Sequence, residues 1–234
     1  METLILSRRS CGPTVSRDLA DVICSSTALT ALKFNGTALH DDFYGFLEGK
    51  VKTSKVERLS LISMEISEEH ASRNLARFLN DLPRLKDLTL QDNRFGGQFY
   101  TELASGACSV EVGFSGHSIR KLHLDHQSNN DILQYGITVD RLFPMLEHLY
   151  FATLQTVSPN ILGSFAHSGL KELSFAAENR HGLTKEDEEC HVPLIGDPSS
   201  LEQVFLNSFP LLTNLTFDNL VIGNNRCETI LGSL

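Results

Sequence analysis

Histidine and acidic side chains alternate with leucines at one point of the chain, where His123 and Asp125 flank Leu124. Imidazole nitrogens and carboxylate oxygens bind zinc, and imidazole also exchanges protons near neutral pH. In a β-strand, however, alternate residues lie on the same face, so any amphipathic strand produces this spacing. The pattern therefore favours a polar sheet face, and we predict no metal site.

Two other stretches look like chemical motifs but each lacks an essential part. Gly45 to Lys50 resembles a phosphate-binding loop, yet it has three residues between its glycines where that motif has four, and Val51 stands where a hydroxyl would hold magnesium. His181 and the pair Cys190-His191 have no second ligand pair of matching spacing. We predict no catalytic or cofactor-binding residues, and therefore a protein that is not an enzyme.

A repeated phrase, apolar-x-x-apolar-x-apolar, defines the elements that must position the polar residues. Its commonest spacing is 27 to 29 residues, which lies in the range of leucine-rich repeats. Each phrase fits a short strand, and about eight units of 24–34 residues would use the whole chain. The middle apolar residues of the phrase are Leu4, Leu32, Leu59, Leu88, Leu122, Leu149, Leu173 and Leu215.

The segments between the phrases have helical periodicity. Ala71, Leu75 and Leu82 recur at helical spacing after Ser67, which is a plausible N-cap. Further helices are expected over 16–24, 41–47, 98–104, 158–165, 201–208 and 226–231. The predicted fold class is therefore α/β, a leucine-rich repeat solenoid of horseshoe shape, with a parallel concave sheet and convex helices.

Units of this length with a full helix resemble the ribonuclease-inhibitor-like type of leucine-rich repeat protein. The resemblance implies an Asn or Cys three residues after the third apolar position, where its side chain bonds backbone groups between coils. Asn93 occupies this position in one unit, whereas Thr37 and Met64 occupy it in two others. The asparagine ladder is therefore expected to be degenerate.

The helical segment from Ile66 to Leu79, running into the strand segment from Leu85 to Asn93, is similar to the carboxy-terminal repeats of NOD-like receptors from invertebrate animals. This resemblance implies a cytosolic sensor of innate immunity, whose repeats recognise a ligand and restrain an adjoining NTPase module. Two alternatives stay open. One is a free-standing adaptor or inhibitor, and the other is the substrate-recognition arm of a ubiquitin ligase.

Composition limits the classes of binding partner and the cellular compartment that we expect. The net charge of -9 argues against nucleic acid, because phosphate binding needs clustered Lys and Arg. The apolar run at the start is too short for a membrane span or a signal peptide, and the five cysteines are odd in number and scattered. We predict a cytoplasmic protein that binds neither nucleic acid nor membrane.

The organisation is predicted to be a single domain over residues 1–234, a fragment of a longer repeat array. This expectation arises because the chain starts inside a strand phrase and stops within or just after a helix. The longest gap between phrases contains residues 181–200, with the charged run from Lys185 to Glu189. We interpret this insertion as an acidic surface loop.

The polar residues between the apolar strand positions should form columns on the concave face. Adjacent strands lie about 4.8 Å apart, so His123, Asp125, His148 and Tyr150 are expected to cluster. Aromatic and titratable groups together are typical of a binding spot. We predict a protein partner there, contacted by Lys121, His123, Asp125, His148, Tyr150 and Glu172.

Overall fold

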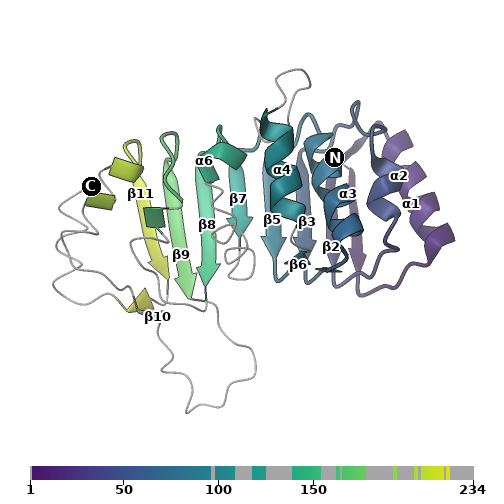
Figure 1. The fold of residues 1–234 in the computed structure, drawn as a ribbon, viewed down its shortest axis with the longest axis horizontal. Coiled ribbons are helices and arrows are strands. Elements are labelled where there is room, and N and C mark those ends of the chain that lie inside the picture. The colour runs from purple at the N-terminus through teal and green to yellow at the C-terminus, as the bar shows by residue number, and fades with distance from the viewer. Residues whose placement is uncertain are drawn as a thin grey trace, which may run out of the picture.

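The computed structural model describes residues 2–95, 98–108, 118–124, 139–153, 162–163, 165–177, 192–193, 203–204, 207–218 and 220–221. Strands and helices alternate along the first half of the chain, and strands predominate among the described residues of the second half (Figure 1). The elements are β1 Glu2–Ser7, α1 Pro13–Ser25, β2 Leu29–Asn35, α2 Phe43–Leu47, β3 Arg58–Ile62, β4 Glu65–Ile66, α3 Glu69–Asn80, β5 Asp87–Gln91, β6 Arg94–Phe95, α4 Gln98–Cys108, β7 Lys121–Leu124, α6 Val139–Leu142, β8 His148–Thr153, β9 Glu172–Ala177, β10 Val192–Pro193, β11 Asn214–Asp218 and β12 Leu220–Val221.

The main sheet has eight strands in the order β1-β2-β3-β5-β7-β8-β9-β11, and each neighbouring pair is parallel. The order follows the chain without a reversal, so each strand lies beside its predecessor and its successor (Figure 1). The prediction of an α/β fold with a parallel sheet is confirmed. The short strands pair separately, β4 with β6 and β10 with β12.

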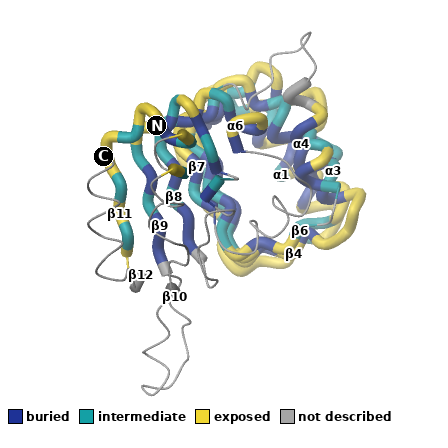
Figure 2. The backbone as a smooth tube through the Cα atoms, turned by 60° about the vertical axis from the view of Figure 1, so that its left-hand side comes forward, coloured by how far each residue is buried: buried dark blue, intermediate teal, exposed yellow. Residues whose placement is uncertain are grey.

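The repeated phrase sets the register of the sheet. Its middle leucines pair with one another from strand to strand, as Leu59 with Leu88 and Leu122 with Leu149. These leucines and the third apolar residues of the phrase face the hydrophobic core with the buried sides of α1 to α4, and the buried backbone appears in dark blue in Figure 2. Burying one such leucine stabilises the fold by about 2 kcal/mol.

A left-handed backbone turn follows each of the first four strands of the main sheet, β1, β2, β3 and β5. Arg8, Gly36, Ser63 and Asp92 have φ values of 49°, 56°, 52° and 51°, and each lies two residues after the third apolar position. The turn lets the backbone N–H of Ser63 donate to the carbonyl of Gln91 in the next coil at 2.8 Å. The sequence does not reveal this recurring turn, because glycine adopts the left-handed conformation most readily and only Gly36 among the four residues is a glycine.

Asn93 has the position and the bonds expected from the resemblance. It is 2% exposed, its Oδ1 accepts from the backbone N–H of Met64 at 3.0 Å, and its Nδ2 donates to the carbonyl of Leu61 at 2.9 Å. The hydroxyl of Thr37, at the same place in another coil, donates to the carbonyl of Leu6 at 3.1 Å. A buried polar side chain therefore links coils in both places.

Helix boundaries differ from the sequence-based expectation in one instructive case. Helix α3 begins at Glu69 with Glu68 as its N-cap residue and no side-chain capping bond, so the prediction of Ser67 as the cap was wrong. The chain is still extended there because the two-residue strand β4 pairs with β6 just before the helix. The backbone carbonyl of Ile66 instead accepts a hydrogen bond from the Ser72 hydroxyl.

Some expectations fall mostly outside the described residues. Within 181–200 the structure describes Val192–Pro193 alone, as β10, and the helix predicted over 226–231 is not among the described residues. In the described part of the chain, no helix combines the length and the apolar composition needed to cross a membrane.

Candidate binding face of the sheet

The strand register brings most of the predicted site residues together. On the face opposite the helices, Lys121 of β7 lies beside His148 of β8, which lies beside Glu172 of β9. His123 and Tyr150 occupy the adjoining row on β7 and β8. Asp125 lies outside the described residues. We call Lys121, His123, His148, Tyr150 and Glu172 the sheet-face cluster.

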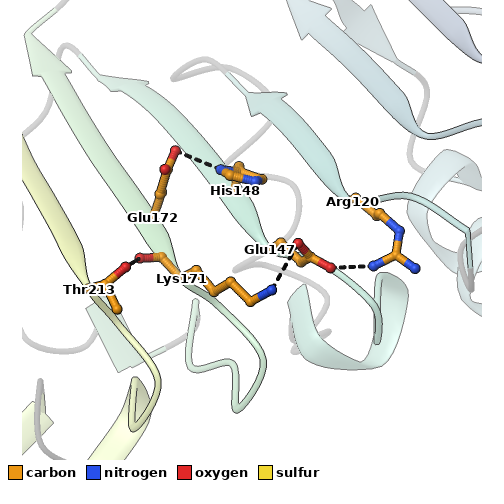
Figure 3. Close-up of polar contacts among 6 residues, drawn as sticks. All are labelled: Arg120, Glu147, His148, Lys171, Glu172 and Thr213. Carbon is orange, nitrogen blue, oxygen red and sulfur yellow. Dashed lines mark hydrogen bonds and ion pairs between the residues drawn. The ribbon is translucent and has the colours of Figure 1, made fainter.

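Glu172 makes side-chain hydrogen bonds to both neighbouring strands. Its Oε2 lies 2.6 Å from Nδ1 of His148, and its Oε1 accepts from Nδ2 of Asn214 at 3.1 Å. Figure 3 shows the His148 ring and the Glu172 carboxylate turned toward each other across two strands. Because the carboxylate only accepts, His148 donates from Nδ1. Sequence reasoning missed Asn214, although it stands in the same row on β11.

His123 and Tyr150 form an aromatic pair beside this network. Their ring centroids lie 4.2 Å apart, with the ring planes inclined at 49°. Burial lowers the pKa of His123 below its usual range, so the imidazole is neutral at pH 7. Tyr150 was expected to be exposed but is half-buried, because its ring contacts that of His123. The pair presents a small uncharged platform within a polar face.

A second row of charged residues lies at the edge where the strands begin. Glu147 pairs with Arg120 on one side, and on the other its Oε2 lies 3.1 Å from Nζ of Lys171 (Figure 3). The hydrogen bond from Lys171 is the largest of the effects that lower the pKa of Glu147, and Arg120 adds to it. The sequence carries a signal for this row, because each member is the second residue of the repeated phrase.

Backbone bonds beneath this row hold the strands in register. The carbonyl of Arg120 accepts from the backbone N–H groups of Glu147 and His148, each at 2.9 Å. The carbonyl of Glu147 accepts in the same way from Lys171 and Glu172, at 2.8 and 3.0 Å. Each coil therefore fixes the starting point of the next strand, and this places the side chains of the sheet-face cluster side by side.

The acid titration of Glu172 offers a direct check of the network. The hydrogen bond from His148 is the main cause that lowers the pKa of Glu172, with smaller contributions from Asn214 and the charge of Lys121. Because the folded-state pKa lies below the unfolded one, this contribution to stability is present above the unfolded pKa and is lost as the pH falls through the folded pKa. We expect His148→Ala to raise the pKa of Glu172.

Nuclear magnetic resonance of the side-chain carboxyl carbons measures this shift. Glu147 is the internal control, because its partners Arg120 and Lys171 are unchanged by the substitution. Equal pKa values for Glu172 in the two proteins would mean that His148 does not bind its carboxylate in solution.

The sheet-face cluster combines hydrogen-bonding groups with an aromatic pair on one surface. Among the described residues, no group of three or more His, Cys, Asp and Glu side chains is placed to hold a metal ion. No protein-family model matches the sequence. No curated protein matches it either.

Proposed function

We propose that the chain is a non-catalytic, protein-binding leucine-rich repeat module that uses the sheet face opposite the helices. The observation that carries the proposal is the register of β7, β8 and β9, which aligns the sheet-face cluster in two adjoining rows. Parallel strands hold these side chains at fixed spacing, and a preordered surface loses little conformational freedom on binding.

Three features support the repeat type. The strand order follows the chain, whereas doubly wound α/β sheets reverse their order near the middle. The left-handed turn recurs at equivalent positions after β1, β2, β3 and β5. Asn93 makes the bonds between coils that the ribonuclease-inhibitor-like resemblance implies.

The side chains of the cluster support binding to a protein. Tyrosine is enriched at protein interfaces because its ring offers apolar area with a polar tip. Here the half-buried Tyr150 lies beside the neutral ring of His123, in the row next to that of Lys121, His148 and Glu172. Such a surface can hold an apolar side chain of the partner in the middle and form hydrogen bonds around it.

The wider context rests on the resemblance of the segments 66–79 and 85–93 to invertebrate NOD-like receptors. In that context the module is the ligand-sensing and autoinhibitory part of a cytoplasmic innate immune receptor. The partner is then either a ligand or another domain of the same receptor, and the same sheet face serves both.

The double variant Tyr150→Ala with His148→Ala tests the proposal. It is expected to weaken binding of a protein captured by the wild-type chain by about tenfold or more, because aromatic anchors dominate interface energies. The measurement is the dissociation constant of the captured partner, together with the melting temperature of each variant. The melting temperature should fall by no more than about 4 °C.

The matched control is Val15→Ala with Val22→Ala, which truncates two exposed side chains, 56% and 55% accessible, on helix α1. This control is expected to keep wild-type affinity, because α1 covers the other side of the sheet. An unaltered affinity in the Tyr150 and His148 variant would remove the sheet-face cluster as the binding surface.

A further inference from the structure

We propose that the end of the molecule formed by β1 and α1 binds a second copy of this chain, with the two β1 strands paired antiparallel about a two-fold axis. The inference goes beyond the proposed function, because the sheet-face cluster lies on β7, β8 and β9, at least four strand steps from β1. The end carries six apolar side chains that are largely or partly exposed. We call them the end patch: Leu4, Ile5, Leu6, Val15, Leu19 and Val22.

Strand β1 is an edge strand without the usual protection. Among the described strands, β2 alone pairs with it, so β1 has a free row of backbone N–H and C=O groups that another strand can join. Soluble proteins usually block such an edge with a charged residue, a proline or a bulge. Residues 3–7 contain neither a charged residue nor a proline, and they pair with β2 in unbroken register. The edge is therefore regular and open to pairing.

Both faces of β1 leave apolar area uncovered. Ile5 is 58% exposed on the face opposite the helices. On the core face Leu4 and Leu6 are half-buried, whereas Leu32 and Phe34, their neighbours on β2, are fully buried. A strand added to the free edge would cover Leu4 and Leu6 on the side that β2 does not reach.

Helix α1 continues the apolar surface beside the strand. Val15 and Val22 are 56% and 55% exposed, and Leu19 between them is half-buried. Arg17 marks the opposite flank, because its guanidinium lies 5.0 Å from the ring centre of Phe46 on α2. At 3.6 residues per turn, Val15 and Val22 lie about 150° around the helix from Arg17. The stripe therefore faces away from α2, at the end of the row of helices (Figure 1).

The residues of β1 fix the register of such a pair. When the two strands are centred on Ile5, Leu4 of each copy lies opposite Leu6 of the other, and the two Ile5 side chains face each other. Moving the centre by one residue would place a leucine opposite Glu2 or Arg8. Cross-strand apolar pairs stabilise an antiparallel ladder. The centred register is therefore the favoured one.

Charges at the two ends of β1 indicate that the occupant is a second copy. Glu2 begins the strand, and Arg8 and Arg9 follow its end. Because antiparallel strands place the beginning of each beside the end of the other, the acid of each copy meets the arginines of its partner. Among the described residues, none of these three side chains takes part in an ion pair. Opposite charges across strands favour pairing.

The two-fold symmetry brings both layers of the end together. An axis perpendicular to the sheet keeps the helices of the two copies on the same side, so the stripes on α1 meet where the β1 strands pair. The same patch then serves both copies, and the contact closes at a dimer. The end patch is covered without a change in either chain.

Sedimentation velocity of the intact protein tests the inference. Between about 1 and 100 μM the sedimenting species is expected to change from monomer to dimer, as micromolar affinity requires. Ile5→Lys is expected to raise the dissociation constant about tenfold or more, because symmetry places two ammonium groups opposite each other. The matched control is Leu211→Lys, at a residue 57% exposed just before β11, which should dimerise as the wild type does. Circular dichroism confirms that both variants are folded.

Cysteine cross-linking tests the register. The Cα atoms of opposed residues in an antiparallel pair lie about 4.5–5.5 Å apart, within the range that a disulfide spans. Ile5→Cys is therefore expected to give a covalent dimer on mild oxidation. Ser7→Cys is the control, because residue 7 of the second copy lies about 14 Å away along the strand. The wild-type chain gives the background of its own five cysteines on the same non-reducing gel.

Four results would overturn the inference: a monomer at every concentration, oligomers larger than a dimer, an undiminished dimer in Ile5→Lys, or equal cross-linking at residues 5 and 7. They are distinguishable from a failure of the proposed function. Val15→Ala with Val22→Ala is expected to weaken the dimer and to leave the affinity for a captured protein unchanged, because it alters the end patch and not the sheet-face cluster.

Discussion

Leu149→Asp is expected to leave the protein largely unfolded at room temperature. Leu149 is 2% exposed and lies between Leu122 and Leu173 in the row of core leucines. The substitution removes about 2 kcal/mol of apolar burial and places a carboxylate without a partner among apolar side chains, at a cost of several kcal/mol more. Together these losses are comparable with the whole stability of a small domain, about 5–15 kcal/mol.

Urea unfolding followed by circular dichroism measures the loss. The control is Leu211→Asp, because Leu211 is 57% exposed just before β11 and the charge there stays in water. We expect this control to change the free energy of unfolding by about 0.5 kcal/mol or less. Wild-type stability in Leu149→Asp would contradict the register of β8.

The register could be predicted from the sequence because it depends on period and burial alone. In a strand, side chains alternate between faces, so a slip of one residue would expose every core leucine. The phrase therefore placed Leu88 beside Leu59, and it likewise placed Tyr150 beside His123 on the opposite face. Five of the six predicted site residues lie where the pattern puts them, and Asp125 is outside the described residues.

The contacts between coils could not be predicted in the same way. The bond between Glu172 and Asn214 joins residues 42 positions apart, across the longest gap between phrases. The repeated phrase places Asn214 in the same row as Glu172, but the bond itself depends on the rotamers of both side chains, and no local pattern encodes those. The ion pairs of Glu147 depend on side-chain length and direction, which period alone does not specify.

The left-handed backbone conformation after the strands could not be predicted from the sequence either. Ser63 and Asp92 adopt the left-handed region that glycine favours, at φ of 52° and 51°. The N–H of Ser63 bonds the carbonyl of Gln91, and the Ser63 hydroxyl donates to Asp92 Oδ2 at 2.9 Å. Hydrogen bonds between coils thus offset a local cost of about 1 kcal/mol or more per residue, and such compensation is visible only in three dimensions.

Asn93→Ala is expected to destabilise the protein by about 3 kcal/mol. The amide of Asn93 satisfies the N–H of Met64 and the carbonyl of Leu61, and both bonds are buried. Each buried backbone group left without a partner costs about 1–3 kcal/mol. Asn207→Ala is the matched control, because Asn207 is exposed and should change stability by about 0.5 kcal/mol or less. Chemical unfolding monitored by circular dichroism gives both values.

Thr37→Val extends this prediction to a second junction, by which we mean a place where a buried polar side chain bonds the backbone of a neighbouring coil. Valine has the shape of threonine without the hydroxyl, so the variant removes the hydrogen bond to the carbonyl of Leu6 and is expected to cost about 1 kcal/mol. Thr37 follows β2 and Asn93 follows β5, two strand steps away, and no side-chain bond joins them among those described. Their effects should therefore add to within about 0.5 kcal/mol in the double variant. A clear departure from additivity would mean that the two junctions are coupled through Met64, the apolar residue that occupies the equivalent position in the coil between them.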